Sequence, residues 1–110
     1  MAHPTSVHAP EDSGVPPHAR DFSVMDKVVI VTGAGQGIGR ELSRQFAAAG
    51  AAVVVADIIG ANADRVQGEI EASGGRAIAV AVDIGDKASV EAMAAHVTAK
   101  LGRVDVLINN

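Results

Sequence analysis

The chain has 110 residues, room for one domain at most. Hydrophobic residues make up 48% of it and aromatic residues only 2%, so any core must be aliphatic. A formal net charge of −4 gives no electrostatic reason to expect nucleic acid or an acidic membrane surface as a partner. Without cysteine, the sequence excludes disulfides, thiolate catalysis and cysteine-ligated metals. No run approaches the ~20 apolar residues of a membrane span, and no signal-peptide pattern opens the chain, so we expect a cytoplasmic protein.

Residues 1–24 are predicted to be a disordered tail, because they hold all four prolines of the chain and show no apolar period. His3, His8 and His18 fall in this segment, but their proline-broken spacing does not suit a metal site, and no bound metal is expected. Met25, directly before the first predicted strand, is an alternative start of the chain.

The first predicted strand is the continuous apolar run Lys27–Thr32, as expected of a strand that is buried on both faces. A helix follows the strand and ends at Gly50. Its apolar period is carried by Ile38, Leu42, Phe46 and Ala49.

The second predicted strand is the apolar run Ala52–Asp57. The second helix then has its apolar period at Ala63, Val66 and Ile70. Gly74 and Gly75 end this helix, and Ala77–Asp83 forms a third strand.

The third predicted helix is capped by Asp86 and ended by Gly102. Its apolar stripe consists of Val90, Met93, Ala94, Val97 and Leu101. Val104–Asn109, as apolar as the first strand, is the fourth strand. The order β-α-β-α-β-α-β implies right-handed crossovers and a parallel sheet. We therefore predict an α/β fold, an incomplete Rossmann-like doubly wound sheet with strand order 3-2-1-4.

Four glycines, at positions 33, 35, 37 and 39, separate the first strand from the first helix. The simple dinucleotide fingerprint G-x-G-x-x-G does not fit, because Ile38 and Arg40 stand where its last glycine would fall. The Walker pattern also fails, because no Lys-Ser/Thr pair follows the last glycine. The pattern that fits is T-G-x-x-x-G-x-G, at Thr32, Gly33, Gly37 and Gly39.

The three glycines of this motif have separate roles. Gly33 lets the chain leave the strand in a tight turn, Gly37 lets backbone amides approach a pyrophosphate, and Gly39 lets the helix pack closely on the sheet. The positive end of the helix then faces the phosphates. The motif therefore predicts a bound dinucleotide.

Asp57 ends the second strand at about the distance that a ribose-binding acid requires. Its carboxylate can accept hydrogen bonds from both ribose hydroxyls and would repel a 2′-phosphate. Gln36 stands where a basic residue would help to hold that phosphate, and Ile58 and Ile59 are apolar, so NAD is favoured over NADP. Arg40, a basic residue near the loop, favours NADP instead. The alternative is an ordinary glycine turn with a solvated acid at the strand end.

Polar residues also end the last two strands. Asp83 would lie near the adenine, where its carboxylate can accept from the exocyclic amine; the alternative is a turn aspartate before Gly85. The amides of Asn109 and Asn110 can bond backbone in the neighbouring strand and the cofactor ribose.

The motifs together resemble the short-chain dehydrogenases/reductases across residues 26–110. The resemblance rests on the segment Thr32–Gly39, Asp57, the pair Asp83-Ile84, and the run Leu107-Ile108-Asn109-Asn110. It implies a Rossmann fold, hydride transfer between a nicotinamide and an alcohol or carbonyl substrate, and a homo-oligomeric parent protein. Residues 25–110 would be the NAD-binding part of the domain.

The family pattern also implies a role for each matching position. The pyrophosphate would be held by Gly33, Gly35, Gln36, Gly37, Ile38 and Gly39. Asp57 would hold the adenosine ribose, Asp83 and Ile84 would contact the adenine, and Asn110 would contact the cofactor ribose.

The catalytic residues of that family have no counterpart here. The family uses a Ser and a Tyr-x-x-x-Lys downstream of an N-N-A-G motif, of which this sequence holds the two asparagines and no tyrosine. His96 is expected at the surface of the third helix, and Asp105 is expected to be a polar residue at a strand start. We therefore expect no catalytic residue and no activity in these 110 residues alone, and the substrate pocket is not encoded in them.

The first interpretation is an N-terminal fragment of an NAD-dependent oxidoreductase that ends inside the N-N-A-G motif. The alternative is a complete, non-catalytic NAD-binding or partner-binding module whose last strand edge is covered by another chain. A third interpretation, an S-adenosylmethionine-dependent methyltransferase, is disfavoured by the T-G-x-x-x-G-x-G spacing and the asparagine pair.

Overall fold

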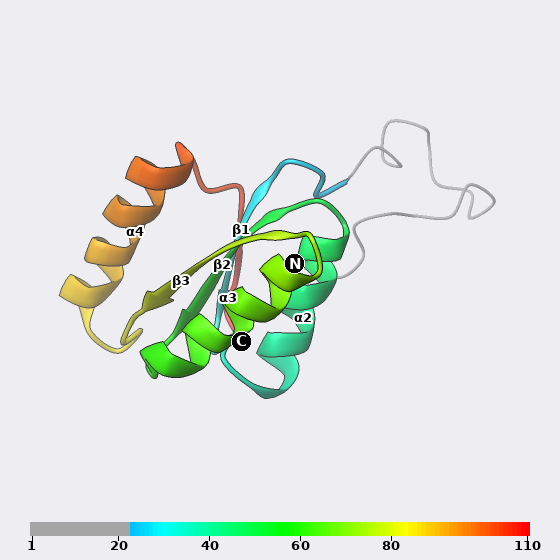
Figure 1. The fold of residues 1–110 in the computed structure, drawn as a ribbon. Coiled ribbons are helices and arrows are strands. Elements are labelled where there is room, and N and C mark those ends of the chain that lie inside the picture. Colours follow the sequence, from blue (N-terminus) through cyan, green and yellow to red (C-terminus); the bar gives the residue numbers. More distant parts are fainter. Residues whose placement is uncertain (1–22) are drawn as a thin grey trace, which may run out of the picture.

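The structure is a computed structural model that describes residues 23–110 (Figure 1). Strands and helices alternate along it, as the sequence predicts. The elements are β1 (Val28–Thr32), α2 (Gly37–Ala48), β2 (Ala52–Asp57), α3 (Gly60–Ala72), β3 (Arg76–Ala81), α4 (Lys87–Leu101) and β4 (Val106–Ile108).

All four strands are parallel and follow the order β3-β2-β1-β4, which confirms the predicted topology. Val29 pairs with Val53 of β2 on one side and with Val106 of β4 on the other. Parallel strands end at one common edge, so this register brings the carboxyl ends of β1, β2 and β4 together. The crossing point of the chain between β1 and β4 is where doubly wound folds bind ligands.

Helices cover both faces of the sheet, with α2 and α3 on one face and α4 on the other (Figure 1). The alternation along β1 explains the two layers. Val29 and Val31 pack in the cluster that contains Phe46 of α2, whereas Val28 and Ile30 pack in the cluster that contains Met93 of α4. A strand with apolar neighbours on both faces must be a continuous apolar run, as the sequence of β1 and β2 shows.

The two outer strands differ from their predicted bounds. β3 begins one residue before the predicted start and ends two residues before the predicted end. It is only partly buried along its length, because it is the sheet edge next to β2 alone. β4 is three residues long rather than six, since beyond Ile108 the chain bonds to the side chain of Thr32 instead of continuing the ladder. Leu107 of β4 is 58% exposed.

The predicted helix stripes were wrong at three positions. Ile38 is 73% exposed, because the first turn of α2 extends past the strand ends, and Ala49 and Ala94 are also exposed. Ser43 is buried in their place, and its Oγ donates to the carbonyl oxygen of Gly39 at 2.8 Å. Small residues lie on this face of α2 because the helix approaches the sheet closely. Serine can be buried there because its hydroxyl is hydrogen-bonded.

The predicted tail is one residue too long at its end. Val24 is 5% exposed and packs in the core, and its carbonyl oxygen accepts from the amide of Lys27 at 2.9 Å. The rest of the tail prediction, with its histidines, falls on residues 1–22 and lies outside the described residues. Among the helices of residues 23–110, none combines the length and apolar content needed to cross a membrane. The same residues contain no group of acids and histidines arranged to hold a metal ion.

Candidate functional site

The glycine loop connects β1 to α2 with two residues in the left-handed region. Gly33 has a φ of +62° and Gly37 a φ of +60°, conformations that strain any residue with a side chain. Gly39 is needed for a different reason: a Cβ there would collide with the carbonyl of Gly33. The loop and the helix start are therefore in direct contact, as the motif predicts.

The N-terminus of α2 has no side-chain cap. A Cβ placed on Gly37 would meet no atom within 4 Å. The side chain of Gln36, the N-cap residue, makes no capping hydrogen bond, and the first turn holds no acid. The first amides of the helix therefore have no side-chain acceptor and can bind an anionic group.

Asp57 lies beside this loop with its carboxylate fixed by two backbone amides. Oδ2 accepts from the amide of Gly35 at 2.8 Å, and Oδ1 accepts from the amide of Ile59 at 2.9 Å. The residue is 8% exposed. A Cβ on Gly35 would lie 2.6 Å from the Cβ of Asn62 and 2.8 Å from Oδ2 of Asp57. Gly35, which the motif left without a role, thus allows the acid and α3 to approach the loop.

The end of β4 is tied to the end of β1. The amide of Asn110 donates to Oγ1 of Thr32 at 3.0 Å, and its Nδ2 donates to the carbonyl oxygen of Gly33 at 3.3 Å. The Thr32 hydroxyl lies 3.2 Å from Oδ1 of Asn109, to which it can donate. The asparagine amides therefore bond the neighbouring strand, as the sequence suggests.

Asp83 makes the turn that the sequence left open as an alternative. Its Oδ1 accepts from the amide of Gly85 at 2.9 Å. It also takes part in a shallow cavity of about 190 Å³ at the carboxyl edge of the sheet. The lining of this cavity consists of Gly33, Asp57, Ile58, Val82, Asp83, Ile84 and Asn110. Five predicted site residues thus meet around one hollow, while Gln36 and Ile38 lie exposed on the neighbouring loop and helix start.

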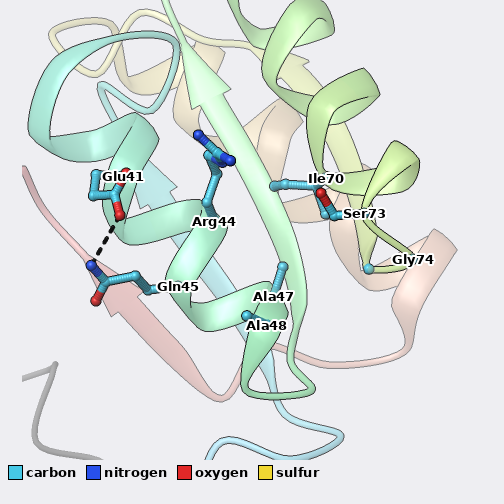
Figure 2. A pocket seen from close by; sticks show the side chains of 9 residues that line it. Glu41, Arg44, Gln45, Ala47, Ala48, Ile70, Ser73 and Gly74 are labelled. Carbon is cyan, nitrogen blue, oxygen red and sulfur yellow. Dashed lines mark hydrogen bonds between the residues drawn. The ribbon is translucent and has the colours of Figure 1, made fainter.

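A larger hollow of about 460 Å³ lies between the outer parts of α2 and α3 (Figure 2). Glu41, Arg44 and Gln45 line it from α2, with Oε2 of Glu41 accepting from Nε2 of Gln45 at 3.1 Å. Ile70 and Ser73 line it from α3. None of the predicted site residues is among its lining, which includes the residues directly before β3 and so lies away from the carboxyl ends of the strands. The smaller cavity is therefore the candidate site.

The comparison with known families agrees with this geometry. Residues 27–110 match the sequence model of the family described as short chain dehydrogenase. The chain belongs to the short chain dehydrogenase family. This membership confirms the resemblance and decides against the methyltransferase interpretation.

Relatives of this chain include proteins named as dehydrogenases. It is 47% identical over 85 residues to meso-2,3-butanediol dehydrogenase of Serratia marcescens, and 48% identical over 84 residues to 7alpha-hydroxysteroid dehydrogenase of Escherichia coli K12. These alignments cover 77% and 76% of this chain and 33% of each relative. The chain thus spans about a third of the length of the curated relatives it matches.

Solved structures show the same fold. A 7alpha-hydroxysteroid dehydrogenase complexed with NADH and 7-oxo glycochenodeoxycholic acid matches with a TM-score of 0.78 at 45% identity. The match covers 80% of this chain and 34% of that one. A citronellol catabolism dehydrogenase of Pseudomonas aeruginosa matches with a TM-score of 0.77 at 35% identity.

Arg40 pairs with an acid of α3. Its Nε donates to Oε1 of Glu69 at 2.8 Å and its Nη2 donates to Oε2 at 3.1 Å, which makes a bidentate salt bridge between α2 and α3. The hydrogen bond from Arg40 is the main cause that lowers the pKa of Glu69 below its usual value. The arginine that the sequence weighed against NAD therefore already has an acid partner.

Arg65, which sequence reasoning missed, lies at the loop instead. Its Nη2 is 3.4 Å from the carbonyl oxygen of Gly35 and 3.1 Å from Oδ1 of Asn62. The sequence shows that Arg65 follows Asn62 by three positions, so the two lie on one face of a helix. The sequence does not show that this face is the one next to the glycine loop.

The two remaining candidates lie away from the cavity. Asp105 precedes β4 at the opposite edge of the sheet, where its Oδ2 accepts from the amide of Val28 and from Nε of Arg103, both at 2.8 Å. The bond from the Val28 amide, followed by that from Arg103, lowers the pKa of Asp105. Its predicted role at a strand start is what the structure shows. His96 is exposed on α4.

Proposed function

We propose that this chain forms the NAD-binding portion of an oxidoreductase that transfers a hydride between a nicotinamide and an alcohol or carbonyl substrate. The observation that carries the proposal is Asp57, whose carboxylate is held by the amides of Gly35 and Ile59 at the cavity beside the glycine loop. Each carboxylate oxygen has a further lone pair for a ribose hydroxyl. Family membership supports the proposal.

The residues present fit the rest of the cofactor. The bare amides at the start of α2 would hold the pyrophosphate, with Gly37 leaving room for it. The exposed side chains of Ile58 and Ile84 line the cavity and would contact the two faces or edges of the adenine. Asp83 lies in the same lining, and Asn110 would reach the ribose. When bound, NAD supplies the hydride chemistry; these residues bind and orient it.

The proposal includes a preference for NAD over NADP. The negative charge of Asp57 opposes a 2′-phosphate at the same ribose. Gln36 is neutral, and Arg40 is paired with Glu69. The relative that was solved with NADH supports NAD as the cofactor class.

None of the residues at the cavity is proposed to transfer a proton. The chain contains no tyrosine, and His96 lies exposed on α4, away from the cavity. For the whole protein we propose a small alcohol or carbonyl compound as substrate and a homo-oligomeric assembly. The relatives, a butanediol dehydrogenase and a hydroxysteroid dehydrogenase, support the substrate class.

The test is cofactor binding by the protein and its Asp57→Ala variant. Isothermal titration calorimetry would measure the Kd for NADH and for NADPH. Removing a charged acceptor of ribose hydroxyls is expected to weaken NADH binding by about tenfold to a hundredfold. NADPH binding should change less or improve, so the preference is relaxed.

The matched control is Asp64→Ala, which removes an exposed acid of α3 and should leave both affinities unchanged. Equal loss of NADH and NADPH binding in Asp57→Ala would count against the ribose role. Failure of the folded wild-type protein to bind NADH would overturn the function itself.

A further inference from the structure

Gly35 connects two charged side chains of opposite sign. Its amide donates to Oδ2 of Asp57 at 2.8 Å, while its carbonyl oxygen is 3.4 Å from Nη2 of Arg65. One residue of the loop therefore has the candidate ribose acid at its amide and an arginine at its carbonyl. The close approach depends on the missing side chain, because a Cβ on Gly35 would lie 2.6 Å from Cβ of Asn62 in the first turn of α3.

Arg65 is available for a stronger acceptor. Both of its hydrogen-bond acceptors are neutral oxygens, and the longer of the two contacts is at the outer limit for a hydrogen bond. Within residues 23–110 Arg65 forms no ion pair, whereas Arg40 has Glu69. Arg65 itself is exposed, so an anion in solution can reach its guanidinium group.

We propose that Arg65 binds the 2′-phosphate of NADP at the ribose subsite, and that Asp57 limits this binding in the wild-type protein. The proposal rests on the function proposed above. A guanidinium binds phosphate oxygens with paired, charge-assisted hydrogen bonds, which are stronger than its present bonds to neutral oxygens. Cofactor preference at this subsite is then a balance between an acid and a base on either side of Gly35, and it is not an absolute exclusion of NADP.

The experiment compares four proteins: the wild type, Arg65→Gln, Asp57→Asn and the double variant. Kd values for NADH and NADPH are measured at one fixed salt concentration. Asp57→Asn is expected to bind NADPH about tenfold more tightly than the wild type, because a repulsion is removed. Adding Arg65→Gln should abolish that gain and change NADH affinity by less than about threefold, since NADH carries no 2′-phosphate.

Arg44→Gln in the Asp57→Asn background is the matched control. It removes the same charge from α2 at the larger hollow, away from the ribose subsite. It should leave most of the NADPH gain in place. If Arg44→Gln and Arg65→Gln weaken NADPH binding equally, the loss comes from the overall charge of the protein and not from a contact of Arg65, and the proposal is overturned.

A second measurement on the wild type does not depend on the fold of any Asp57 variant. The Nε–H signal of Arg65 is followed by NMR while adenosine 2′,5′-bisphosphate or 5′-AMP is added. A shift with the bisphosphate that exceeds the shift with 5′-AMP supports the proposal; equal shifts overturn it. If the wild type binds NADH but Arg65→Gln has no selective effect on NADPH, the inference fails and the proposed function stands. If the wild type binds neither cofactor, both fail.

Discussion

The strands β1 and β4 are joined by side chains at both of their ends, and the two ends use different chemistry. At the amino end, the charged carboxylate of Asp105 accepts from the amide of Val28 and from Arg103. At the carboxyl end, the neutral hydroxyl of Thr32 accepts from the amide of Asn110. Both contacts hold β4 where its short backbone ladder stops.

The two ends differ in how their acids are held. At the amino end, the acid Asp105 forms an ion pair with Arg103. At the carboxyl end, the acid Asp57 accepts from the backbone amides of Gly35 and Ile59 and forms no ion pair within residues 23–110, so each carboxylate oxygen has a spare lone pair for a further donor. Substitutions at the carboxyl end should therefore change cofactor binding, whereas substitutions at the amino end should change stability and leave binding intact.

The largest effect at the carboxyl end is expected from Gly39→Ala. The added Cβ would collide with the carbonyl of Gly33 and lie 2.7 Å from Nδ2 of Asn110, so the loop, the helix and the end of β4 would all have to move. We expect a loss of about 1–3 kcal/mol in the free energy of unfolding, as for other overpacked sites. NADH binding should fall below detection. Urea unfolding and calorimetry measure the two effects.

Gly68→Ala is the control for this substitution. A Cβ at Gly68 meets no atom within 4 Å, and the residue lies inside α3. Alanine there should raise stability by about 0.5–1 kcal/mol, because glycine disfavours a helix interior. Wild-type NADH affinity in Gly39→Ala would show that the loop is not the pyrophosphate site.

A smaller effect at the same end is expected from Thr32→Val, which keeps the shape of the side chain and removes the hydroxyl. The amide of Asn110 then loses its acceptor, which costs about 1–2 kcal/mol in the free energy of unfolding. NADH affinity should fall as well, because Asn110 lines the cavity. Thr98→Val on the exposed side of α4 should change neither quantity. Lost stability with unchanged affinity would separate Asn110 from the cofactor.

The smallest effect is expected at the amino end, from Asp105→Asn. The Val28 amide and Arg103 lower the folded-state pKa of Asp105, so the stabilising contribution of its carboxylate is complete above the ordinary aspartate pKa of 3.8. That contribution is lost as the pH falls through the lowered folded-state pKa. The variant should be less stable than the wild type at pH 7, and the gap should narrow below about pH 4.

Urea unfolding across this pH range measures the gap, with Asp64→Asn as an exposed control. NADH affinity at pH 7 should be unchanged in Asp105→Asn. A gap that stays constant down to low pH would show that the carboxylate charge is not what holds the amino end. A weakened NADH affinity would break the division between the two ends.

The sequence by itself determined the order of elements, the strand order and the placing of the glycines. A parallel strand covered on both faces requires an uninterrupted apolar run, and the runs of β1 and β2 are readable for that reason. The glycine spacing is equally local, since the left-handed turns at Gly33 and Gly37 are properties of single residues. Asp57 could be predicted as a candidate residue because it ends the second apolar run, which follows the strand and helix that carry the glycine motif.

The tertiary structure alone decided which arginine reaches the glycine loop. From the sequence, Arg40 is near the loop and Arg65 is 30 positions from Gly35; in the fold, Arg40 pairs with Glu69 and Arg65 reaches the loop. The same holds for the amino-end contact of Asp105, 77 positions from Val28. Such contacts depend on how each helix is rotated against the sheet and on how the strands are aligned. Periodicity along one segment specifies a face, but it does not specify which distant residue that face will meet.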